Sequence, residues 1–140
     1  MKYTIYTDGA SFNNPGPAGA GIAIYKDEIL FKEYALPLGV MTNNQAEYWA
    51  LLLALKKLKH LVGATGIKKI EIEVRSDSEL LVNQLNHRYK VLDEKVQKLF
   101  FEVWNLLIDF GAVTFTHIPR EKNKVADKLS KQAAGLNQEL

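Results

Sequence analysis

The fold depends on the segment Lys69-Ile70-Glu71-Ile72-Glu73-Val74-Arg75, in which apolar side chains alternate with charged ones. A period of two predicts a β-strand with one buried face. A helical pattern from about Asn44 to about Leu61 precedes this strand, and Ser76-Asp77-Ser78-Glu79 begins another helix after it. A strand between two helices needs crossover connections and therefore lies parallel to a neighbouring strand. The segment thus predicts an α/β protein.

The elements on either side complete the predicted sheet. Three β-branched or aromatic runs come first, Lys2–Thr7, Ala20–Lys26 and Ile29–Leu36, and short turn-forming segments join them into an antiparallel meander. After the second helix we expect a helix from about Leu92 to about Phe110, a strand Val113–Ile118 and a helix from about Asn123 to about Ala134. We predict one α/β domain over residues 1–140, with a mixed five-stranded sheet: the three-strand meander plus two parallel strands, flanked by helices.

Composition narrows the class of protein. The 140 residues are 47% hydrophobic, carry a formal charge of +2 and include no cysteine, which excludes disulfides, thiolate nucleophiles and cysteine-ligated zinc. No apolar run approaches the ~18 residues of a membrane span, so we expect a cytoplasmic protein without membrane contact. Two basic clusters weakly indicate a polyanionic partner; they lie at residues 56–69 and between His117 and Lys131.

Two carboxylates stand where carboxylates are unusual. Asp8 ends the first strand, and the Asp8-Gly9 pair is equally compatible with the start of a turn. Glu47 lies on the apolar stripe of the first helix, where an ionised carboxylate is costly without a cation or several donors. A first-turn Glu that interacts with the helix dipole is the alternative, but the stripe favours a functional role.

Two further carboxylates begin helices. Asp77 directly follows the fourth strand, at the edge where α/β sheets place ligands, although Ser-Asp-Ser-Glu is also a capping sequence. Asp127 lies one turn into the last helix, where an exposed position is the ordinary alternative. Parallel pairing would bring Asp8 beside Asp77, with the two helix starts nearby. Four such acids need a cation, and hard oxygen ligands select Mg²⁺ or Mn²⁺. Two such ions about 3.5–4 Å apart would suit phosphodiester cleavage.

Four short motifs resemble those of the ribonuclease H family, type 1. They are Tyr6-Thr7-Asp8-Gly9-Ala10-Ser11 with Asn14-Pro15-Gly16-Pro17-Ala18-Gly19, Thr42-Asn43-Asn44-Gln45-Ala46-Glu47, Ser76-Asp77-Ser78 and Asn123-Lys124-Val125-Ala126-Asp127. The resemblance covers essentially the whole chain in order. It implies a metal-dependent endoribonuclease that cuts the RNA strand of RNA–DNA hybrids and leaves 5′-phosphate and 3′-hydroxyl ends.

The resemblance also assigns residues. Asp8, Glu47, Asp77 and Asp127 match the family's metal ligands, for which we expect Mg²⁺, with Mn²⁺ as an alternative. Asn14, Asn43 and Asn44 match residues that contact the minor groove and the 2′-hydroxyls, which distinguish RNA from DNA. Thr42 matches a position in the DNA-phosphate pocket.

The chain also departs from the family pattern. Many members carry a His in the loop before the fourth carboxylate, whereas this loop is only Pro119-Arg120-Glu121-Lys122, which makes Arg120 the candidate substitute. The basic protrusion of many relatives is missing between Leu85 and Leu99, and we expect no separate hybrid-binding domain. Binding of the hybrid would then depend on contacts in its minor groove and on the two basic clusters. The affinity for the hybrid would therefore decrease as the salt concentration rises.

Other readings of the same residues remain open. A hybrid- or RNA-binding module that does not cut would be favoured by a missing carboxylate, and all four are present. A nuclease that acts on DNA would not need asparagines that read 2′-hydroxyls. A short-loop member is also compatible with cleavage of duplex RNA. We expect a monomer without an organic cofactor.

Overall fold

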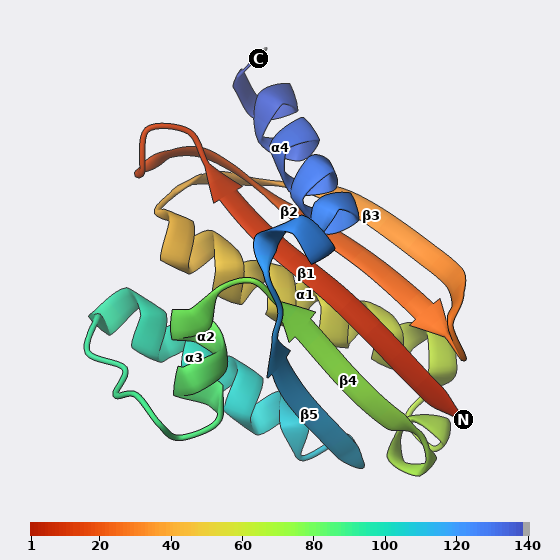
Figure 1. The fold of residues 1–140 in the computed structure, drawn as a ribbon. Coiled ribbons are helices and arrows are strands. Elements are labelled where there is room, and N and C mark those ends of the chain that lie inside the picture. The colour runs from red at the N-terminus through yellow and green to blue at the C-terminus, as the bar shows by residue number, and fades with distance from the viewer. Residues whose placement is uncertain (139–140) are drawn as a thin grey trace.

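A computed structural model describes residues 1–138, and its centre is one mixed five-stranded sheet in the order β3-β2-β1-β4-β5 (Figure 1). The strands are β1 (Lys2–Ser11), β2 (Gly16–Lys26), β3 (Ile29–Met41), β4 (Glu71–Ser76) and β5 (Ala112–His117). β1, β2 and β3 pair antiparallel, whereas β4 pairs parallel with both β1 and β5. The predicted mixed sheet is therefore confirmed, including the pairing of the first strand with the fourth.

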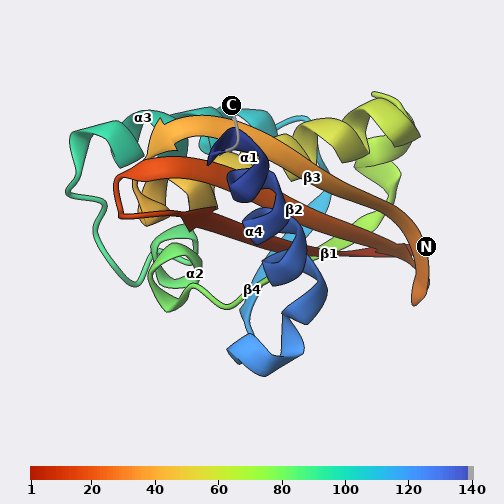
Figure 2. The ribbon, with the colours of Figure 1, turned by 90° about the horizontal axis from the view of Figure 1, so that it is seen from above.

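Helices cover both faces of the sheet. They are α1 (Asn43–Val62), α2 (Glu79–Leu85), α3 (Glu94–Leu107) and α4 (Lys124–Gln138), and two 3₁₀ turns, η1 (Gly66–Lys69) and η2 (Arg120–Lys122), precede β4 and α4. α1 and α3 lie on one face, and α4 crosses the other face (Figures 1 and 2). Among residues 1–138, no helix has the length and apolarity needed to cross a membrane.

The meander strands are longer than predicted. β2 begins at Gly16 rather than Ala20, β3 continues past Pro37 to Met41, and the turn between β1 and β2 is confined to residues 12–15. Pro37 is tolerated because β3 is an edge strand, where a missing N–H breaks no ladder. Gly19 in this extended strand serves packing, because a Cβ there would collide with the backbone of α4.

The hydrophobic core fills the layer between α1 and the sheet. Ile5, Ile22 and Ile72 from three adjacent strands pack with Leu51 and Leu55 of α1, and all five side chains are fully buried. Packing along this whole face fixes the axis of α1 relative to β1. The first turn of α1 therefore lies at the carboxyl end of the parallel strands.

The start of α1 is fixed by a capping box. The Thr42 hydroxyl accepts a bond of 3.2 Å from the Gln45 amide nitrogen, and the Gln45 side chain accepts one of 2.8 Å from the Thr42 amide nitrogen. Thr42 and Gln45 thus form a capping box at the start of α1. Such boxes satisfy two N–H groups that a helix end leaves unpaired.

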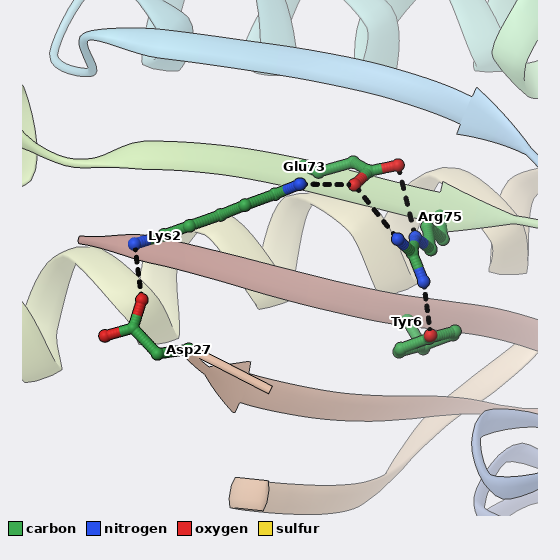
Figure 3. A network of polar contacts seen from close by, with 5 residues as sticks. All are labelled: Lys2, Tyr6, Asp27, Glu73 and Arg75. Carbon is green, nitrogen blue, oxygen red and sulfur yellow. Dashed lines mark hydrogen bonds and ion pairs between the residues drawn. The ribbon is translucent and has the colours of Figure 1, made fainter. Parts of the chain in front are cut away.

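A polar network covers part of the sheet face that also carries α4 (Figure 3). Arg75 makes two hydrogen bonds of 3.1 and 3.2 Å to Glu73 and one of 2.6 Å to the Tyr6 hydroxyl, while Lys2 contacts Glu73 at 3.0 Å. Hydrogen bonding from Arg75 lowers the pKa of Glu73 to about 2 against the opposing effect of burial, and Lys2 lowers it further. The network joins β1 to β4 at their parallel interface.

Replacing Glu73 by Gln tests this network. A lowered carboxyl pKa stabilises the fold above the unfolded pKa of about 4.5 and loses this effect as pH falls toward about 2. We expect Glu73→Gln to reduce the free energy of unfolding by about 1 kcal/mol at pH 7, and by clearly less at pH 3. Urea denaturation at both pH values measures this. Glu71→Gln, at an exposed position of the same strand, is the matched control; an equal loss in both variants would contradict the assignment.

Candidate metal centre

Three carboxylates meet at the carboxyl ends of β1 and β4. One oxygen each from Asp8, Glu47 and Asp77 lies within 4.8 Å of the others. Asp8 comes from β1, Glu47 from the beginning of α1 and Asp77 from the residue after β4. Asp8 and Glu47 are buried, at 6% and 8% exposure, and Asp77 is half-buried. The predicted convergence is confirmed for these three acids.

Two glycines let helices approach β1 and β2 closely enough to form this cluster. A Cβ on Gly9 would collide with the backbone of Ala46 and Glu47, so α1 lies directly on β1, and the Gly9 N–H donates a hydrogen bond to Glu47 Oε1. On the other face, Gly21 pairs with Asp8 across the β1–β2 ladder, and a Cβ there would collide with the backbone of α4. Both approaches depend on the absent side chains.

Asp8 is therefore a mid-strand residue and not the start of a turn, since β1 continues to Ser11. Glu47 lies on the buried stripe of α1 as expected, but at the end where the stripe meets the sheet edge. Both side chains enter the cluster, and their roles as metal ligands stay predictions. For Asp77, the adjacent Ser78 performs the capping, because its side chain accepts the Leu81 N–H. The Asp77 carboxylate is thus left available to the cluster.

Burial and like charges disfavour ionisation of the cluster. Burial raises the pKa of Asp8 to about 7; a hydrogen bond from Ser130 opposes this rise, and the charges of Asp77 and Asp127 add to it. Burial also raises the pKa of Glu47, and the charge of Asp8 adds to that effect. A cation at this point would favour the ionised carboxylates.

Asp127 lies at the margin of the cluster. It sits in the first turn of α4, half-buried, and its carboxylate pairs with Lys131 at 3.1 Å. It does not belong to the group of three oxygens within 4.8 Å, yet its charge raises the pKa of Asp8. Its predicted role as a metal ligand stays a prediction.

Two buried polar residues that we did not predict contact the cluster. The Asn123 side-chain nitrogen donates to the Thr7 carbonyl oxygen at 2.9 Å and to Asp77 Oδ2 at 3.2 Å, and the Ser130 hydroxyl lies 2.5 Å from Asp8 Oδ2. Both side chains are essentially unexposed. One sign of the role of Ser130 was present in the sequence: it is a polar residue between Ala126 and Ala133 on the apolar stripe of the last helix.

The predicted substrate-contacting asparagines adjoin one another beside the cluster. Asn14 Oδ1 accepts a bond of 2.8 Å from the Asn43 backbone N–H, and Asn43 Oδ1 accepts one of 2.9 Å from the Ser11 N–H. Both residues are exposed. The side-chain oxygens of both asparagines accept these internal bonds. The side-chain N–H groups of Asn14 and Asn43 are therefore the donors that each residue presents to a ligand. Asn44 lines a hollow of about 220 Å³ that also includes Glu47.

The remaining predicted residues are Thr42, Arg120 and the basic cluster at residues 56–69. Thr42 caps α1 as an acceptor and keeps its own hydroxyl hydrogen. Arg120 is exposed in η2, three residues before Asn123. The basic residues of the 56–69 cluster lie toward the other end of α1: at 1.5 Å per residue, Lys59 is roughly 18 Å along the axis from Glu47. Lys59 is also paired with Asp109 at 2.8 Å.

The donor set fits a hard divalent cation. It consists of carboxylate oxygens from three elements, without cysteine anywhere in the sequence. Mg²⁺ and Mn²⁺ prefer such oxygen ligands, whereas zinc prefers nitrogen and sulfur. The site is therefore a candidate divalent-metal centre.

Comparison with known proteins places the same residues in one family. The model of the family described as reverse transcriptase-like matches residues 6–133. The chain is 36% identical over 135 residues to the "Bifunctional protein Rv2228c" of Mycobacterium tuberculosis, covering 95% of this chain and 35% of that protein. It is also 36% identical to the "Ribonuclease HI" of Halobacterium salinarum, covering 91% of this chain and 62% of that protein. The chain thus spans less than two thirds of the length of these relatives.

Solved structures give the same result. LC11-RNase H1, determined in complex with an RNA/DNA hybrid, superposes with a TM-score of 0.90 and 38% identity. The match covers 96% of this chain and 97% of that one. This chain and LC11-RNase H1 are therefore similar in sequence as well as in fold.

The raised pKa of Asp8 predicts a pH-dependent stability without metal. A raised carboxyl pKa stabilises the fold below the unfolded value of 3.8, and this contribution is lost as pH rises through about 7. In EDTA, we expect the thermal midpoint of the parent protein to decrease as the pH is raised from 5 to 8. Asp8→Asn should flatten this fall, and Mg²⁺ should raise the midpoint of the parent at pH 8 but not that of Asp8→Asn.

Differential scanning calorimetry across this pH range measures both effects. Asp109→Asn, at an acid far from the cluster, is the control and should keep the parent's slope from pH 5 to pH 8. A parent whose midpoint in EDTA does not change over this range would contradict the cluster's electrostatics.

Proposed function

This chain belongs to the ribonuclease H family, and we propose that it is an endonuclease that hydrolyses the RNA strand of RNA–DNA hybrids. The observation that carries the proposal is the buried cluster of Asp8, Glu47 and Asp77 at the carboxyl edge of the sheet. The family relationship supplies the substrate class. We expect 5′-phosphate and 3′-hydroxyl products.

Asp8, Glu47 and Asp77, with Asp127 beside them, are the residues that would hold divalent cations. Bound Mg²⁺, or Mn²⁺ in its place, would supply positive charge to the attacking and leaving oxygens of an in-line displacement, with two ions as the expected number. The protein's own part is to hold the carboxylates. Gly9 N–H bonds Glu47, and Asn123 bonds Asp77, so that each acid is oriented by a donor from another element.

The asparagines adjoining the cluster suit recognition of an RNA strand. Asn14 and Asn43 are exposed and present amide N–H donors, and Asn44 lies beside Glu47 in the hollow. Ribose 2′-hydroxyls and minor-groove base edges offer acceptors to such donors. We propose that these three residues contact the hybrid across its minor groove.

Two further assignments complete the proposal. Thr42 would donate its hydroxyl hydrogen to a phosphate of the DNA strand, and Arg120 would act near the scissile phosphate in place of the family's loop His. One chain carries the whole cluster, so we propose a single catalytic domain that acts as a monomer. We also propose that it acts in the cytoplasm and without an organic cofactor.

A cleavage assay on four labelled duplexes tests the proposed function. The substrates are RNA–DNA, RNA–RNA, DNA–DNA and a DNA duplex with a few ribonucleotides, each with Mg²⁺, Mn²⁺ or EDTA. We expect metal-dependent cutting of the RNA strand in the hybrid. Asp8→Asn should reduce the rate by at least 10³-fold with an unchanged circular dichroism spectrum, because a ligand is lost. Comparable cutting of DNA–DNA would overturn the assignment, and cutting of RNA–RNA would reveal a side activity.

Replacing Asn43 by Asp tests substrate recognition separately from folding. Aspartate keeps the oxygen that accepts the Ser11 N–H but replaces the donating amide by a negative charge. We expect KM for the hybrid to rise about tenfold or more, with a thermal midpoint within 2 °C of the parent. Asn105→Asp, an equal charge change at an exposed position of α3, is the control. Equal KM values for both variants would contradict the assigned contact.

A further inference from the structure

Ser130 is a buried hydroxyl in contact with the metal centre. Its side chain is 0% exposed, and its oxygen lies 2.5 Å from Asp8 Oδ2, although the two residues are 122 positions apart in the sequence. It lies outside the four motifs that resemble the ribonuclease H family. Its contact with Asp8 is a feature of the three-dimensional arrangement alone.

The packing of α4 on β2 explains how so short a side chain reaches Asp8. Asp8 pairs with Gly21 in the β1–β2 ladder. A Cβ on Gly21 would collide with the Ala126 carbonyl oxygen and lie 2.6 Å from the Ser130 nitrogen, and one on Gly19 would collide with the Ser130 carbonyl oxygen. The backbone of α4 at Ser130 therefore rests on β2 directly beside Asp8. A bulkier residue at either glycine would hold the hydroxyl out of reach.

A local role for this serine is the alternative. Its oxygen also lies 2.9 Å from the Asp127 carbonyl oxygen, three residues earlier, and serines in helices often bond such carbonyls. A hydroxyl carries one hydrogen and donates it to one acceptor at a time. The carboxylate is the charged acceptor and lies closer, and hydrogen bonds to charged groups are about twice as strong as neutral ones. Donation to Asp8 therefore prevails when that carboxylate is ionised.

We propose that Ser130 is a positioning residue of the metal centre, which holds the Asp8 carboxylate in the orientation that brings one of its oxygens within 4.8 Å of Glu47 and Asp77. The inference rests on the proposed function, because it assumes that the cluster binds divalent ions. Partners that orient a ligating carboxylate typically change metal affinity by 10- to 100-fold when removed. Ser130 thereby links the packing of α4 to the affinity of the centre.

Metal titration of the full chain tests this role. The probe is Mn²⁺ alone, added to metal-free protein in an isothermal titration calorimeter at pH 8. We expect Ser130→Ala to raise the Kd for Mn²⁺ about tenfold or more. Ser130→Cys, which keeps the size but donates poorly, should show the same loss. Affinity for an uncut hybrid in EDTA should stay within twofold of the parent, and excess Mg²⁺ should restore kcat in Ser130→Ala.

Ala133→Gly is the matched control for helix packing. Ala133 is buried on the same face of α4, against Gly19, but its methyl group cannot donate a hydrogen bond to a carboxylate. Removing the Ala133 methyl group should lower the thermal midpoint, because glycine in a helix is about 1 kcal/mol less favourable than alanine. The Kd for Mn²⁺ should stay at the parent value. A weaker Kd in Ala133→Gly equal to that of Ser130→Ala would show that loosened packing, and not the hydroxyl, controls affinity, and would overturn the inference.

The remaining outcomes are also decisive. A Kd within twofold of the parent in either serine variant overturns the inference while the proposed function stands, provided that the parent binds Mn²⁺ and cleaves the hybrid. A parent that binds no Mn²⁺ overturns both. Loss of folding in both serine variants, seen by circular dichroism, would show that the hydroxyl serves the fold and would reject the positioning role.

Discussion

Close approach of two helices to the backbone of the sheet is the constraint on which the rest of the structure depends. α1 contacts the backbone of β1 at Gly9, and α4 contacts the backbone of β2 at Gly21. The sheet therefore lies closely packed between two helices near the carboxylates. Neither approach tolerates a side chain at the glycine. Because Asp8 sits between these two contacts, its distance from Glu47 and its bond to Ser130 follow from main-chain packing.

The same packing creates an electrostatic conflict that the protein only partly relieves. Each carboxylate receives a donor from a different element: Glu47 from the backbone at Gly9, Asp77 from Asn123, and Asp8 from Ser130. These bonds favour the charged forms, but burial still raises the pKa of Asp8 and Glu47. The arrangement therefore lowers the stability of the metal-free fold and favours binding of a cation. Such a trade-off between stability and function is common at functional sites.

Sequence reasoning predicted the features that depend on periodicity and order. The alternation at residues 69–75 identified the parallel strand, and the apolar stripe of the first helix exposed Glu47 as an anomaly. It was wrong about where β2 begins: residues 16–19 are paired strand, and Gly19 admits the backbone of α4, whereas Gly16 packs against the Phe12 backbone across the turn. It also missed Asn123 and Ser130 as contacts of the site, since periodicity identifies a buried face but not which atoms meet across more than a hundred residues.

The position of β1 in the sheet has a consequence for synthesis. β1 is the first strand of the sequence and the middle strand of the sheet, with β2 on one side and β4 on the other. While the ribosome is still making the segment before residue 71, the meander is available but one edge of β1 has no partner. An open central edge of this kind is a template for pairing with other nascent chains. The edge of β1 is therefore exposed to misassembly during synthesis, until β4 pairs with it.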